Sequence, residues 1–224
     1  MHSRENPSED YKELLDEYIK LHTKGNKKIA PDVMFNGISI IYYLKDLQKI
    51  VKIESCKSIL DYGCGKAFLY SKDKYNKLAI DKNNNTLPKP LPEIWNLDYF
   101  ALYDPGYEKY NTLPKGKYDG VICSDVIEHI DEKDSDWVLE EIFSFARKFV
   151  FLTIACYEAL KKFDNGRNVH VNVKSIEFWK DKLNILHKKY PYLKIYTALD
   201  TVIQDKNDKD YGHFKTNPYI IERK

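Results

Sequence analysis

The turn Gly63-Cys64-Gly65 is the segment of this chain best suited to chemistry, because it follows directly on the apolar run and acid of residues 58–61. Glycine is needed where the backbone takes a positive φ or where a ligand lies against bare backbone. In an open α/β sheet, ligands bind just outside the carboxyl ends of the strands, at turns of this kind. The segment therefore predicts a buried parallel strand, a tight turn that contacts an adenosine-type cofactor, and a helix after the turn.

A second acid, Asp104, follows the apolar residues 100–103 and begins an Asp-Pro-Gly turn. A cofactor with a ribose needs an acid at the second strand, and an ionised acceptor makes each such hydrogen bond worth about 1.5–3 kcal/mol. Asp81, at the end of the run 78–81, is the alternative. We prefer Asp104, because its apolar run leads directly into a Pro-Gly turn. Residues 70–98 then form an enlarged connection that can cover the site, and the third strand must be very short.

The elements that position these turns alternate between strands and helices. We expect helices at 8–22, with Ser8 as N-cap, and at 38–52, 134–145 and 175–190. Strands are expected at 58–61, 100–103, 118–123, 148–156, 193–198 and 219–222, with loops over most of 70–95 and at 157–172. This alternation predicts an α/β fold: a Rossmann-like, mostly parallel sheet of about six to seven strands with helices on both faces. We expect one domain, 1–224, in which an N-terminal helical cap (1–54) precedes the Rossmann-like core (55–224).

Composition excludes several classes of protein. The 36 basic and 34 acidic residues give a net charge of +2, which provides no general field for nucleic acid. No apolar run approaches the ~18 residues of a membrane span, and the N-terminus has no apolar signal-peptide core. We therefore expect a cytoplasmic protein that binds neither membrane nor nucleic acid. The four cysteines form no C-x-x-C pair and lack a histidine at zinc spacing, so we expect reduced thiols and no metal.

Two motifs together resemble those of the class I S-adenosylmethionine-dependent methyltransferases. Residues 60–66 (LDYGCGK) match the first motif of that family, and residues 118–129 (YDGVICSDVIEH) match its fourth-strand motif. The resemblance covers roughly residues 55–156. Residues 103–106 and 164–170, with Glu177-Phe178-Trp179 after them, are similar to small bacterial methyltransferases found among capsule and other surface-polysaccharide genes.

The resemblance implies S-adenosylmethionine as donor and S-adenosylhomocysteine as product. It implies that Gly63 and Gly65 let the backbone approach the methionine part, that Asp61 orients the turn and reaches the amino group, and that Asp104 holds the ribose. The full set of implied cofactor-binding residues is Asp61, Tyr62, Gly63, Gly65, Lys66, Asp104, Pro105, Asp125 and Val126. One position departs from the usual pattern, because Ala67 stands where a third small residue is expected and Phe68 follows it. The dinucleotide fingerprint G-x-G-x-x-G is therefore absent, which counts against a nicotinamide oxidoreductase.

Methyl transfer from a sulfonium is an in-line displacement, in which the enzyme mainly positions the acceptor atom. A hydroxyl acceptor benefits from a general base, and histidine is the commonest. We hypothesise that His170, in the polar loop expected at 157–172, is the base or a substrate ligand, with His129 as the alternative. A purely structural role stays open for both. Tyr157, Arg167 and Asn168 are the predicted substrate-binding residues, although Arg167 also suits a surface salt bridge and Tyr157 also suits core packing.

The sequence thus predicts a methyltransferase, most simply one that O-methylates a small nucleotide-activated sugar or a related capsule precursor. A nucleic-acid methyltransferase is a rival, but amino-methylating members carry Asn/Asp-Pro-Pro-Tyr/Phe where this chain has Ser124-Asp125-Val126-Ile127. A non-catalytic module that keeps the cofactor site is the second rival. The methyl acceptor and the oligomeric state stay open.

Overall fold

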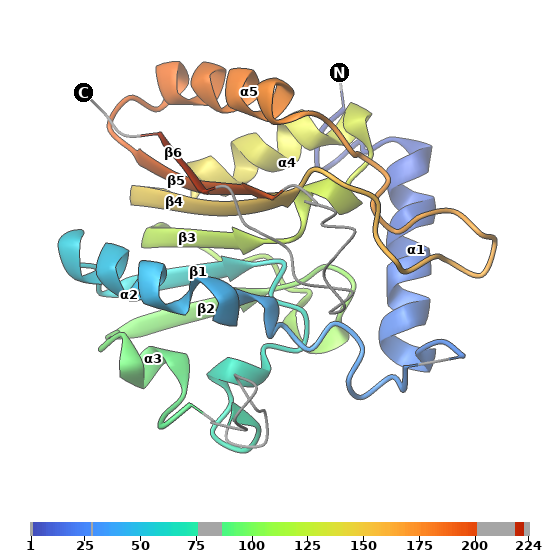
Figure 1. The fold of residues 1–224 in the computed structure, drawn as a ribbon, viewed down its shortest axis with the longest axis horizontal. Coiled ribbons are helices and arrows are strands. Elements are labelled where there is room, and N and C mark those ends of the chain that lie inside the picture. The colour runs from blue at the N-terminus through green and yellow to red at the C-terminus, as the bar shows by residue number, and fades with distance from the viewer. Residues whose placement is uncertain (1, 28, 76–86, 201–217, 222–224) are drawn as a thin grey trace, which may run out of the picture.

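The computed structural model describes residues 2–27, 29–75, 87–200 and 218–221 (Figure 1). Five parallel strands form the sheet: β1 (Ser58–Tyr62), β2 (Tyr99–Tyr103), β3 (Tyr118–Ser124), β4 (Ala146–Ala155) and β5 (Lys194–Asp200). A short antiparallel strand, β6 (Pro218–Ile221), pairs with β5 at the edge. The predicted α/β class and mostly parallel Rossmann-like sheet are confirmed. The parallel part has fewer strands than the six to seven expected, because no strand forms between β2 and β3.

The strand order is β2-β1-β3-β4-β5-β6. The chain moves outward from β1 to β2, then crosses back to place β3 on the other side of β1. Order therefore reverses between β1 and β3, and open α/β sheets bind their ligands at this switch point. β2 pairs with β1 from Ser58↔Tyr99 to Tyr62↔Tyr103, so the strand that leads to Asp104 is the direct neighbour of β1. The alternative strand at 78–81 lies outside the described residues.

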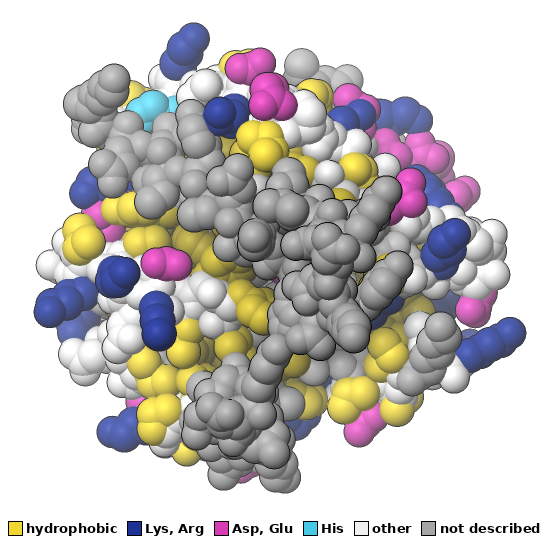
Figure 2. Space-filling model, viewed as in Figure 1, with side chains coloured by type: hydrophobic (Ala, Val, Ile, Leu, Met, Phe, Trp, Pro, Cys, Tyr) yellow, Lys and Arg dark blue, Asp and Glu magenta, His cyan; other side chains and the backbone are white. Residues whose placement is uncertain are grey.

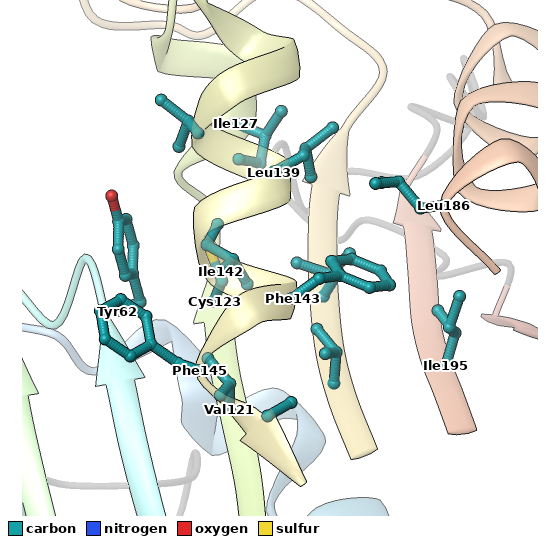
Figure 3. Close-up of a cluster of buried hydrophobic side chains, with 14 of the residues drawn as sticks. Tyr62, Val121, Cys123, Ile127, Leu139, Ile142, Phe143, Phe145, Leu186 and Ile195 are labelled. Carbon is teal, nitrogen blue, oxygen red and sulfur yellow. The ribbon is translucent and has the colours of Figure 1, made fainter. Parts of the chain in front are cut away.

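Two apolar clusters cover the two faces of the sheet. On one face, α4 (Glu132–Ser144) and α5 (Ile176–Lys189) pack Leu139, Ile142, Phe143 and Leu186 against the strands (Figure 3). On the other face, η1 (Ser39–Tyr43), α2 (Leu44–Ile53) and α3 (Leu91–Ile94) bury a second cluster. Ile59 is buried in the second cluster and Leu60 in the first, because successive side chains of a strand point to opposite faces and both faces of this sheet are covered.

The first helix, α1 (Glu9–Lys24), lies across the carboxyl ends of the strands (Figure 1). Ser8 caps it as predicted, because the hydroxyl accepts from the Tyr11 amide at 3.1 Å. α1 buries Tyr11, Leu14 and Leu21, whereas α2 packs on a sheet face. In place of the single helix predicted at 38–52, the structure has two elements, the 3-10 turn η1 and the helix α2.

The prediction of a helix after the glycine turn is wrong for the described residues up to 75, where the 3-10 turn η2 (Phe68–Tyr70) forms and no α-helix does. Ala67 takes a left-handed conformation with a φ of 49°. The amides of Lys66 and Phe68 donate to the carbonyls of Phe35 and Asn36, at 2.8 and 3.0 Å. The left-handed Ala67 and these bonds to residues 35 and 36 hold the chain after the turn in a non-helical conformation.

The stretch between β2 and β3 contains only the 3-10 turn η4 (Glu108–Tyr110), so the very short third strand expected there does not form. Among the described residues, no helix combines the length and apolar character that crossing a membrane requires. Basic and acidic side chains lie side by side on the described part of the face in Figure 2.

Candidate functional site

A pocket of about 740 Å³ opens at the carboxyl ends of β1, β3 and β4. The turn after each of these strands lines it, as does the turn after β2. α1 and residues 29–42 form the opposite wall. This volume lies in the range of small-molecule and cofactor sites, about 300–1,000 Å³. The pocket therefore lies at the switch point of the sheet and is large enough for a nucleoside-sized ligand.

The glycine turn is held by two close contacts. Gly63 has a φ of +82°, and a Cβ added there would lie 2.2 Å from the Val126 Cγ2 atom. Gly65 has a φ of +57°, and its added Cβ would lie 2.2 Å from the Phe35 carbonyl oxygen. Both glycines are therefore required by the conformation and packing of the turn itself, which brings bare backbone to the pocket.

We expect Gly63→Ala to lower the free energy of unfolding by about 2–4 kcal/mol, because the positive φ and the overlap with Val126 each add a cost. Gly116→Ala is the matched control, since Gly116 has a φ of +84° and nothing within 4 Å of an added Cβ. That control should lose only the conformational part, about 1–2 kcal/mol. Urea unfolding followed by circular dichroism measures both. If Gly63→Ala and Gly116→Ala lost the same unfolding free energy, the Val126 side chain would have room for a Cβ atom at position 63.

Asp104 ties the end of β2 to the glycine turn. Its Oδ2 atom accepts from the Gly65 amide at 2.8 Å, and its Oδ1 atom accepts from the Gly106 amide at 2.9 Å. Burial raises the pKa of the Asp104 carboxyl above its usual value, while these two amides act in the opposite direction. Each carboxylate oxygen has a second lone pair, so Asp104 can still accept hydrogen bonds from a ligand.

Asp61 lines the pocket near the end of β1 and is buried. Burial raises the pKa of its carboxyl to about 7, and the neighbouring negative charge of Asp104 acts in the same direction. A positively charged ligand group beside Asp61 would reverse this effect, because an opposite charge favours the ionised carboxylate. The site is therefore suited to a ligand that carries a cation at this point.

Asp125 follows β3 and has an unusual positive φ of 56°. Its Oδ1 atom accepts from the Thr153 hydroxyl at 2.7 Å, and its amide donates to the same hydroxyl oxygen at 2.9 Å. Burial raises the pKa of the Asp125 carboxyl. The strained residue places Val126 against Gly63, which fixes the relative positions of the turns after β1 and β3.

His129 and His170 both line the pocket and contact each other, with ring centroids 4.8 Å apart and ring planes at 82°. His129 Nδ1 lies 3.0 Å from the Val169 carbonyl oxygen and 2.7 Å from the Tyr18 hydroxyl. His170 Nδ1 lies 2.7 Å from the Tyr157 carbonyl oxygen. Burial lowers the pKa of His129 to about 3 and also lowers the pKa of His170, so both imidazoles are neutral at neutral pH.

The pocket brings together ten of the fourteen predicted site residues. They are Asp61, Gly63, Gly65, Asp104, Pro105, Asp125, Val126, His129, Tyr157 and His170. The acids and glycines lie along one side, and the two histidines lie where the polar loop after β4 meets the turn after β3.

Tyr62 and Lys66 lie outside this lining. The Tyr62 hydroxyl donates to Glu141 at 2.7 Å on the α4 side of the sheet, because successive strand residues face opposite ways. Lys66 is buried rather than solvated, and its ammonium donates to the carbonyls of Met34 and His22 at 2.9 and 3.3 Å. Lys66 therefore holds the chain that leads from α1 to the glycine turn.

Arg167 and Asn168 also lie outside the main pocket. Arg167 pairs with Asp131 at 3.7 Å beside a smaller groove, which matches the surface salt bridge that the sequence left open. Asn168 holds its own loop, since its amide group donates to the Ala159 carbonyl at 2.8 Å and accepts from the Ala159 amide at 3.1 Å.

Sequence reasoning did not identify the lining residues Tyr18, His22, Phe35, Glu128 and Lys161. His22 Nε2 lies 3.8 Å from Asp104 Oδ1, and burial together with the Lys66 charge lowers the pKa of His22 to about 3. Glu128 directly precedes His129 in the sequence, and this adjacency was the available signal. Tyr18 and His22 depend on where α1 lies, and Phe35 and Lys161 depend on how the segments after α1 and β4 pack, which no local pattern indicates.

A scan against models of known protein families finds no match, and a search of curated proteins finds no similar sequence.

Proposed function

We propose that the pocket binds S-adenosylmethionine and that the protein is a methyltransferase. The observation that carries this proposal is the convergence of Asp61, Asp104 and Asp125, from the ends of three adjacent strands, around the turn Gly63-Cys64-Gly65. These three carboxylates can accept hydrogen bonds from a ribose diol and carry charge opposite to that of an ammonium or a sulfonium, so they fit a cofactor that combines these groups. When bound, S-adenosylmethionine supplies an electrophilic methyl group.

The two best-placed acids suit different parts of such a ligand. Asp104 accepts from the Gly65 and Gly106 amides through different oxygens, and its remaining acceptor capacity fits ribose hydroxyls. Asp61, with its raised pKa, fits the ammonium group, because that charge would favour the ionised carboxylate. These assignments follow the roles that the family resemblance implies.

The methyl acceptor would occupy the histidine end of the pocket. Val33, Tyr42 and Leu160 are exposed apolar side chains that line the same pocket, and they offer contact area for the body of a small molecule. We propose O-methylation of a small molecule, and the nucleotide-activated sugar or capsule precursor rests on the resemblance alone. Arg167, one of the predicted substrate-binding residues, lies at the smaller groove and adds no support for that substrate.

Calorimetric titration of the purified protein with S-adenosylhomocysteine, and separately with NAD, tests the cofactor class. We expect micromolar binding of S-adenosylhomocysteine and no binding of NAD. Binding of NAD alone would replace the proposal with an oxidoreductase, and binding of neither would remove it. Turnover with candidate hydroxylated acceptors would then separate an enzyme from a non-catalytic cofactor-binding module.

A further inference from the structure

Glu128, His129 and His170 form a compact cluster of ligand-type side chains within the pocket lining. Each offers one ligand atom, and these three atoms lie within 4.8 Å of one another. Glu128 and His129 come from η5 (Ile127–His129), directly after β3, and His170 comes from the loop after β4. The absence of zinc-type cysteine spacing in the sequence does not bear on this site, because its ligands are nitrogen and oxygen.

The hydrogen bonds of the two imidazoles define which nitrogen is available. A carbonyl oxygen only accepts, so the contacts to Val169 and Tyr157 place the ring proton on Nδ1 of both His129 and His170. The Tyr18 hydroxyl completes the network at His129, because it donates to the Val169 carbonyl at 2.9 Å. Each ring then has its lone pair on Nε2. Metal-binding histidines usually donate the other ring N–H to a backbone carbonyl or a carboxylate in this way.

Glu128 is fully buried and its position is fixed by the fold. Its Oε1 atom accepts from the Ala155 amide at 3.1 Å, and its carbonyl oxygen accepts from the Asn172 amide at 3.0 Å. The negative charge of Asp125 acts on His170 and would favour a bound cation. The positive charge of Lys161 acts on both histidines and would disfavour a bound cation. Two carboxylates thus outnumber the one neighbouring ammonium around this cluster.

We propose that Glu128, His129 and His170 bind a divalent transition-metal ion through one carboxylate oxygen and two Nε2 atoms. Because one ligand atom of each residue lies within 4.8 Å of the other two, the three side chains are close enough to share one ion at bond lengths of about 2.0–2.2 Å after small side-chain rotations. Two imidazoles and one carboxylate favour zinc, iron, cobalt or manganese over magnesium and calcium, which prefer all-oxygen sites.

Three protein ligands leave coordination positions open toward the pocket, as in catalytic metal sites. A hydroxyl group in an open position loses its proton more easily, because the cation stabilises the alkoxide. This step rests on the proposed function. It would make the metal, rather than a free His170, the group that activates a hydroxyl acceptor.

The test is a direct measurement of metal binding, made without cofactor or acceptor. Protein treated with a chelator and then desalted is titrated with Co²⁺, followed by visible absorption, and with Zn²⁺, followed by calorimetry. We expect one ion per chain, with micromolar or tighter affinity. His129→Asn, His170→Asn and Glu128→Gln should each weaken binding about 100-fold or more. His187→Asn, on α5 away from the cluster, is the control and should bind like the wild type.

Circular dichroism of each variant shows whether it is folded. If a variant does not fold, the increase in the wild-type melting temperature on adding Zn²⁺ provides the same test without substitution. Absence of binding by the folded wild type would overturn the inference, as would equal binding by all the variants. Titration of the metal-free protein with S-adenosylhomocysteine is independent, so loss of the metal proposal and loss of the methyltransferase proposal give different results.

Discussion

Asp104→Ala is expected to abolish micromolar binding of S-adenosylhomocysteine, weakening it about 100-fold or more. Hydrogen bonds to a charged acceptor are worth about 1.5–3 kcal/mol each, and two ribose hydroxyls would lose theirs. The variant should also lose about 2–4 kcal/mol of unfolding free energy, because the amides of Gly65 and Gly106 lose their acceptor. Calorimetry at low temperature and urea unfolding measure the two effects.

Asp81→Ala is the matched control for this prediction, since Asp81 is the alternative ribose acid. It should bind S-adenosylhomocysteine nearly as well as the wild type does. The stability of Asp104→Asn should fall between that of the wild type and that of Asp104→Ala, because the amide side chain keeps one acceptor oxygen for the two backbone amides. If Asp81→Ala lost more affinity than Asp104→Ala, Asp104 would not be the ribose ligand.

Asp61→Asn is expected to stabilise the protein at about pH 8 while removing most of its affinity for the cofactor. The folded pKa of Asp61, about 7, lies above the usual carboxyl value of 3.8. The native state therefore holds this proton more tightly than the unfolded state does. The contribution of Asp61 to stability is full below about pH 4 and decreases as the pH rises to about 7. Asparagine does not ionise, so the variant avoids this decrease in unfolding free energy, which amounts to roughly 4 kcal/mol at most.

Urea unfolding of the wild type and Asp61→Asn at about pH 4.5 and about pH 8 tests the sign. The advantage of the variant should be large at the higher pH and small at the lower one. Wild-type affinity for S-adenosylhomocysteine should fall as the pH decreases from 8 to 5, because a protonated Asp61 must ionise to hold the ammonium. Asp61→Asn should bind weakly and show little of this dependence. A variant less stable than the wild type at pH 8 would contradict the assigned pKa.

The acids at the strand ends could be predicted because their signal is local. An apolar run that ends in Asp61 or Asp104 and enters a turn specifies a strand and its carboxyl end together. Parallel pairing then brings those ends to one edge of the sheet, and the structure places both side chains in one pocket.

The other wall of the pocket could not be predicted, because it depends on long-range packing. Nothing local indicates that α1 crosses the strand ends, or that the Phe35 and Asn36 carbonyls take the amides of the glycine turn. Lys66 illustrates the same limit. A lysine after a loop is usually solvated, but here the carbonyls of His22 and Met34, both more than thirty residues away in sequence, bury its ammonium.

The attachment of α1 also determines when the pocket is completed. Ser8 hydrogen-bonds to Asp134 across 126 residues, and Arg4 pairs with Glu141 across 137. Contacts between such distant residues form only after the intervening chain has been synthesised, and they must offset a large loop-closure entropy. α1 precedes its α4 partners in the chain and is therefore docked late, after those partners have been synthesised. A ligand that requires both walls of the pocket binds only the state in which α1 is docked. Ligand binding therefore measures how much of the protein has reached that state and also stabilises it.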